Sequence, residues 1–101
     1  MRKILIKFDY RCFPLWIYDN EDFVDNDLPP ELLDDKSLDK ELVALQEEYD
    51  NLFIDDDFSF SFSGFSDSNQ ESQFIKKIMD LEQELILKVG DKYIIQNDTK
   101  L

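Results

Sequence analysis

The spacing of apolar residues changes several times along this chain, and these changes restrict the fold more than any other feature. In residues 2–10 and 58–63 apolar side chains alternate with other residues, which is typical of a strand with one buried face. Residues 15–19 and 92–96 are short runs rich in aromatic and β-branched types, which favour strands. The sequence therefore predicts four strands, of which the first two pair as a hairpin.

Two longer segments instead show the three- and four-residue spacing of amphipathic helices. Ser37 is a good N-cap for the first, while Ser68 and Glu71 form a capping box for the second, which Gly90 ends. The two apolar stripes consist of Leu38, Leu42, Leu45, Tyr49 and Leu52, and of Phe74, Ile75, Ile78, Leu81 and Leu85.

The order of these segments predicts one α+β domain over residues 1–101. Its length suits a single domain, and residues 19–37 form a long acidic loop with room for one helical turn at residues 31–35. Each predicted strand has one apolar face, and each predicted helix has one apolar stripe. A small, mostly antiparallel sheet of about four strands with two helices packed on one face buries both. The expected order is β-β-α-β-α-β.

The negative charge of the chain is concentrated in one segment. Residues 19–57 hold sixteen acidic and two basic residues, whereas the rest of the chain holds eight acidic and nine basic residues. The whole net charge of −13 therefore belongs to this acidic segment. A segregated block creates a directional field that can steer a positively charged partner, although charge runs more often serve as a solvated surface.

The chain lacks residues that several catalytic and ligand-binding functions require. The chain has no histidine, and its two glycines are too few for a phosphate-binding loop, so we expect no enzyme activity and no cofactor. Carboxylate pairs for glycoside hydrolysis are present, but a domain this small rarely builds the required cleft. Residues 19–27 suggest calcium, yet the absence of glycine from the acidic segment argues against an EF-hand loop, and we expect no dedicated metal site.

Charge and apolar run lengths also bear on location and partners. A protein of this net charge is repelled by anionic membrane surfaces and by nucleic acid, and no apolar run approaches the roughly 20 residues of a membrane span. The single Cys12 cannot form an intramolecular disulfide, and the amino terminus lacks a signal-peptide pattern. We therefore expect a cytoplasmic protein with a cationic protein partner.

Two stretches resemble the small acidic immunity proteins of bacterial polymorphic toxin systems, including those of contact-dependent growth inhibition. They are FDYRCFPLWIYDNEDFVDNDLP (residues 8–29) and YDNLFIDD (residues 49–56). The resemblance implies a cytosolic protein that plugs the active site or substrate groove of a toxin domain, often a basic nuclease. Because such families differ in fold and binding face, the resemblance assigns no residue roles.

The leading hypothesis is an immunity protein that neutralises a basic toxin through the acidic segment. Aromatic residues in or beside this segment, namely Trp16, Tyr18, Phe23, Tyr49 and Phe53, are candidates for exposed anchors, Trp16 and Phe53 being equally candidates for the core. The predicted partner-binding residues are Asp19, Glu21, Asp22, Phe23, Asp25, Asp27, Asp34, Asp35, Glu47, Asp50, Asp55, Asp56 and Asp57. The alternatives are a nucleic-acid mimic that inhibits another DNA- or RNA-binding protein, and an adaptor domain whose acidity only aids solubility.

Overall fold

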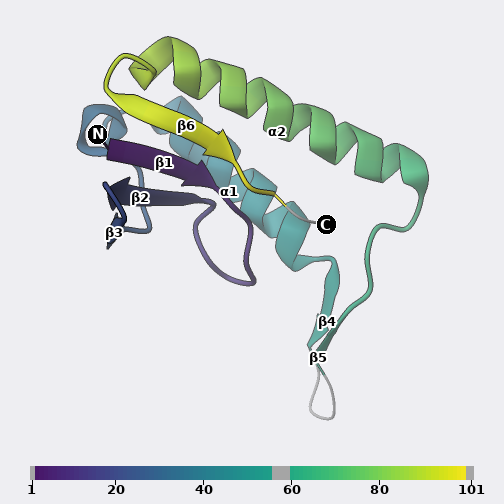
Figure 1. Cartoon of the computed structure of the whole chain (residues 1–101). Helices are drawn as coiled ribbons and strands as arrows, with labels where there is room; N and C mark the ends of the chain where they lie inside the picture. Colours follow the sequence, from purple (N-terminus) through teal and green to yellow (C-terminus); the bar gives the residue numbers. More distant parts are fainter. Residues whose placement is uncertain (1, 56–59, 100–101) are drawn as a thin grey trace.

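A computed structural model describes residues 2–55 and 60–99. A four-stranded sheet with the strand order β3-β2-β1-β6 forms the centre of the molecule. Two helices and a separate two-stranded hairpin complete the fold (Figure 1). The elements are β1 (Arg2–Ile6), β2 (Leu15–Asp19), β3 (Asp22–Asp25), η1 (Pro30–Leu32), α1 (Lys36–Asp50), β4 (Phe53–Asp55), β5 (Phe60–Phe62), α2 (Ser68–Val89) and β6 (Tyr93–Asn97).

The predicted α+β class is confirmed, with both helices on one face of a mostly antiparallel sheet. The first two strands pair antiparallel, as expected, with Ile4 opposite Ile17. The last strand, β6, runs parallel to β1, which is possible because α2 carries the chain back along the molecule before β6 begins. In Figure 1, α1 lies behind the strands and α2 runs along the β6 side.

The core lies between this face of the sheet and the helices. Alternate residues of β1 and β2 point into it, and Ile4, Ile6 and Leu15 are fully buried. Both predicted helical stripes are buried except at Ile75, which is 41% exposed. The buried stripe of α2 runs through Phe74, Ile78 and Leu81. Ile75 follows Phe74 directly, so its side chain is rotated away from this stripe by about 100° around the helix axis.

Both helices begin slightly earlier than the sequence predicts. Asp35, rather than Ser37, caps α1, because its Oδ1 accepts a hydrogen bond from the Leu38 amide at 3.0 Å. Asp67, rather than Ser68, caps α2 through the Gln70 amide at 2.7 Å. Aspartate and serine are both good N-caps, so the choice between adjacent candidates depends on the backbone geometry of the preceding loop.

The prediction of a long loop over residues 19–37 is wrong in part. Residues 22–25 form β3, an exposed edge strand that pairs with β2, and residues 30–32 form a short 3₁₀ helix. The tight turn into β3 places Asn20 at a positive φ of 58°, a conformation that asparagine tolerates better than most residues. Aspartates disfavour strands, so pairing with β2 overrides the local preference here.

The predicted strand at 58–63 does not join the main sheet. Its described part, β5, pairs only with β4, and this hairpin projects from the body of the molecule (Figure 1). Phe58 and Ser59 lie outside the described residues. At its base, the Leu52 carbonyl accepts hydrogen bonds from the Ser63 and Gly64 amides, at 2.6 and 3.1 Å, which holds the two ends of the hairpin together.

The two helices run antiparallel, as the ion pairs near both ends of α1 show. The Lys77 ammonium on α2 lies 2.9 Å from the Glu48 carboxylate near the end of α1, and Lys88 pairs with Asp35 at its start. In the part of the chain that the structure describes, neither helix combines the length and the apolar character that crossing a membrane requires.

Candidate functional site

Six of the predicted partner-binding residues surround the β2–β3 hairpin and the segment before α1, at one end of the molecule (Figure 1). All six are exposed, and none forms an ion pair with another described residue. We call them the strand-edge carboxylates: Asp19, Glu21, Asp22, Asp25, Asp27 and Asp34. Their charges are free to meet a partner.

The local backbone holds four of the strand-edge carboxylates in place. Asp19 and Asp22 face each other across the β2–β3 pair. Asp25 and Asp27 each accept a hydrogen bond from the next residue's amide, at 2.8 and 2.7 Å. Between them, the Asn26 amide group donates to two backbone carbonyls of the β1–β2 region, at 2.6 and 2.8 Å. The carboxylates therefore project from an anchored loop, which lowers the entropy cost of ordering them on binding.

Other predicted carboxylates already have structural roles. Asp35 pairs with Lys88 and also caps α1; the hydrogen bond from Lys88, followed by the one from the Leu38 amide, lowers the pKa of Asp35. Asp50 accepts hydrogen bonds from the Arg11 amide and the Gln46 side chain, both at 2.8 Å. Since Asp35 and Asp50 bound the 15 residues of α1, about 22 Å of helix separates them, and the acidic segment is divided between two ends of the molecule.

The remaining predicted residues are distributed as follows. Glu47 is exposed near the end of α1, beside Asp50, and lines the same surface hollow as Tyr10 and Phe53. Asp55 belongs to β4, but its side chain is not described, and Asp56 and Asp57 lie outside the described residues.

The aromatic candidates separate into exposed and buried residues. Phe23 is 54% exposed, and its ring lies 5.8 Å from that of Tyr18 and 6.0 Å from that of Trp16, both half-buried. The interpretation of Tyr49 as an exposed anchor is wrong, because it is 8% exposed and belongs to the core; Phe53 is half-buried against that core. Phe23 is therefore the aromatic residue best placed to contact a partner beside the strand-edge carboxylates.

Sequence reasoning missed Glu31, which links η1 to the sheet. The Tyr93 hydroxyl donates to its Oε1 at 2.8 Å, and Arg2 lies 3.7 Å from its other oxygen. A hydrogen bond from its own backbone amide, followed by the one from Tyr93, lowers the pKa of Glu31. No sequence signal reveals this contact, because the two residues are 62 positions apart.

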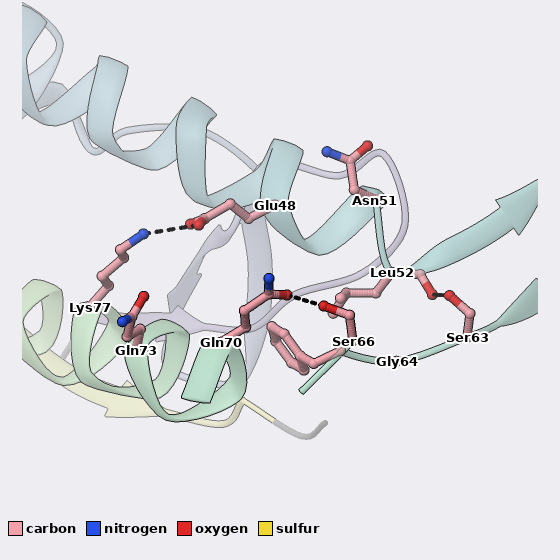
Figure 2. Close-up of a pocket in the computed structure, with 10 residues that line it drawn as sticks. Glu48, Asn51, Leu52, Ser63, Gly64, Ser66, Gln70, Gln73 and Lys77 are labelled. Carbon is pink, nitrogen blue, oxygen red and sulfur yellow. Dashed lines mark hydrogen bonds and ion pairs between the residues drawn. The ribbon is translucent and has the colours of Figure 1, made fainter. Parts of the chain in front are cut away.

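A cleft of about 690 Å³ lies between the end of α1 and the first half of α2 (Figure 2). The Glu48–Lys77 ion pair crosses it, and the Ser66 hydroxyl donates to the Gln70 side-chain oxygen at 2.6 Å. The amides of Asn51 and Gln73 also line the cleft. Such a mixture of amides, hydroxyls and charges suits hydrogen bonding to a polar surface, and no sequence motif marks this cleft.

Cys12 has the environment of a structural thiol. Burial, followed by the nearby charges of Asp9 and Asp50, raises the pKa of its thiol. A raised pKa keeps the thiol protonated at neutral pH, so Cys12 is a poor nucleophile.

Comparison with known protein families gives one match over most of the chain. The family described as Serratia CdiI immunity protein-like matches residues 2–98 of the chain. A search of curated proteins found no match.

Proposed function

Because the chain belongs to the Serratia CdiI immunity protein-like family, we propose that it neutralises a cationic toxin domain, a nuclease, by binding it through the strand-edge carboxylates. Membership of the family supports the immunity role, in which the chain acts by binding a toxin. The cationic character of that toxin, its nuclease activity and the residues that touch it are our proposal.

The observation that carries this proposal is the exposure of six carboxylates without ionic partners among the described residues. A merely solubilising surface would pair many of them with lysine or arginine, since mixed charges reduce self-repulsion. A nuclease binds phosphates with basic side chains, and a carboxylate surface fits the same groove. Close charge pairs across protein interfaces couple by roughly 1.5 to 7 kcal/mol, enough for the contacts to compete with substrate.

Association kinetics with the cognate toxin domain test the binding surface. The variant Asp19→Asn, Asp22→Asn, Asp25→Asn, Asp27→Asn removes four strand-edge carboxylates. We expect the association rate to fall by about tenfold or more at low ionic strength and to lose much of its salt dependence, since opposite fields accelerate encounter. Stopped-flow fluorescence at increasing salt measures both quantities.

The matched control changes the net charge equally but elsewhere. It replaces exposed or half-buried acidic residues on and after α2, namely Glu71→Gln, Asp80→Asn, Glu82→Gln and Asp91→Asn. Equal slowing by both variants would show that only total charge matters and would contradict the proposed surface.

The nuclease part of the proposal needs its own measurement. The toxin domain is incubated with RNA and with DNA, alone and with increasing amounts of the chain. We expect cleavage that stops at stoichiometric addition of the chain. A toxin that binds the chain but cleaves neither nucleic acid would refute the nuclease assignment while leaving the immunity role intact.

A further inference from the structure

Among residues 2–55 and 60–99, no helix covers the second face of the main sheet. Since Ile4 and Ile6 point into the core, Lys3, Leu5 and Lys7 point to the opposite side of β1. We call this side the open face. The strand register places the open-face residues in two rows across the sheet, Phe23–Tyr18–Lys3–Ile94 and Trp16–Leu5–Gln96.

The open face combines exposed apolar area with positive charge. Phe23 and Ile94 are 54% and 51% exposed at opposite edges, and Leu5 between them is almost fully buried by its neighbours. The Lys3 ammonium lies 5.3 Å from the centre of the Tyr18 ring, and that of Lys7 lies 6.0 Å from the Trp16 ring. Within the described strands, the side chains of this face include the cation Lys3 and no carboxylate, and Lys7 directly follows β1, although the whole chain carries a net charge of −13.

This pattern restricts what can dock on the open face. Its aromatic rings are rigid anchors of the type that dominate interfaces, and its lysines require negative groups opposite them. Nucleic acid and a second copy of the chain also carry negative charge, but both would be repelled by the net charge of the molecule. A folded protein with only a few local carboxylates avoids that repulsion.

The open face and the proposed toxin-binding surface meet at the β3 edge of the sheet. Phe23 follows Asp22 directly in β3, and Tyr18 precedes Asp19 in β2, so these rings and carboxylates project from opposite faces of one sheet edge. A protein that docks around this edge contacts the carboxylates on one side and the rings on the other.

We infer that the open face is the second half of the toxin contact and receives an apolar patch of the toxin flanked by carboxylates. This inference rests on the proposed function. It requires the toxin to be cationic where it meets the strand-edge carboxylates and acidic where it meets Lys3 and Lys7.

A charge-reversal experiment tests the inference with the same toxin domain. The variant Lys3→Glu, Lys7→Glu should raise the Kd at least about tenfold, because attraction becomes repulsion. The matched control, Lys40→Glu, Lys76→Glu, makes the same change in net charge at exposed positions on α1 and α2. A cationic toxin should bind this control as tightly as the unmodified chain, or more tightly. Calorimetry measures the Kd, and urea unfolding verifies that each variant is folded.

The sign of the effect decides between the alternatives. If the Lys3/Lys7 reversal strengthens binding or leaves it unchanged, the open face meets no carboxylates and the inference is wrong. In that case the proposed function stands, provided that the strand-edge variant still slows association. If instead the Lys3/Lys7 reversal weakens binding and the strand-edge variant has no effect, the proposed function fails.

A neutral substitution tests the apolar part. Phe23→Ala should weaken toxin binding several-fold, whereas Leu87→Ala, at a position 87% exposed on α2, should not. Sedimentation of the chain alone detects a second copy as the occupant of the open face, and titration with single-stranded RNA detects nucleic acid. If Phe23→Ala leaves toxin binding unchanged but abolishes self-association or RNA binding, the toxin is not the occupant and the inference is overturned.

Discussion

The two faces of the main sheet arise from the same strands but have opposite environments. On the covered face Ile4, Ile6 and Leu15 are fully buried beneath the helices, while on the open face Phe23 and Ile94 remain half exposed. Both faces carry large apolar residues, so hydrophobicity alone does not distinguish them. The covered face has helices packed on it and stabilises the fold, whereas the open face has apolar area left over, which is typical of interaction surfaces.

The largest expected effect follows from breaking the covered face. Leu81→Ala removes a fully buried side chain of α2 and should lower the free energy of unfolding by about 2 to 5 kcal/mol, because a cavity remains in the core. Urea unfolding followed by circular dichroism measures it. Leu87→Ala on the exposed side of the same helix should cost less than about 0.5 kcal/mol, and a similar loss at both positions would contradict the packing described.

A smaller effect is expected at the rim of the covered face. Tyr93→Phe removes the hydroxyl that donates to Glu31 at 2.8 Å and should cost about 1 kcal/mol. Because the folded state lowers the pKa of Glu31, its stabilising contribution is present above the ordinary pKa of a glutamate and is lost as the pH falls. The cost of Tyr93→Phe should therefore shrink in acid, as urea midpoints at neutral and acidic pH would reveal. A cost independent of pH would mean that the hydroxyl does not act through this carboxylate.

The smallest effect is expected where the two helices meet. Burial, followed by a hydrogen bond with Glu84 and its charge, raises the pKa of Glu41. A raised pKa means that the folded state binds the proton more tightly, so this contribution favours folding at low pH and is lost as the pH rises through the folded pKa. Glu41→Gln should thus stabilise the protein at pH 7, and the gain should disappear below about pH 4.3.

The control for Glu41 is Glu47→Gln, an exposed carboxylate on the same helix. It removes the same charge without removing the contact to Glu84, so it should change the urea midpoint less at neutral pH. Equal midpoints for the two variants would show that general charge repulsion, rather than this pair, determines the effect.

The sequence predicted the residue types of the candidate site, but only part of their arrangement in the fold. The acidic segment supplied the candidate residues, and Phe23 and the strand-edge carboxylates are exposed as expected. The sequence could not show that Asp35 and Asp50 are engaged in a cap, an ion pair and backbone hydrogen bonds, because their partners Lys88 and Arg11 are 53 and 39 positions away. It also could not show that lysines and aromatic rings gather on one face, since this depends on strand register.

The sequence by itself determined the α+β class, both helices and the hairpin of β1 and β2, because these depend on local apolar period and good capping residues. Tertiary structure decided that acidic residues 22–25 form an edge strand and that the Phe60–Phe62 strand leaves the sheet. Alternation is a property of a strand alone, whereas the identity of its neighbour depends on contacts between distant segments. For the same reason, only the tertiary structure decided which face of the sheet is covered and which is open to a partner.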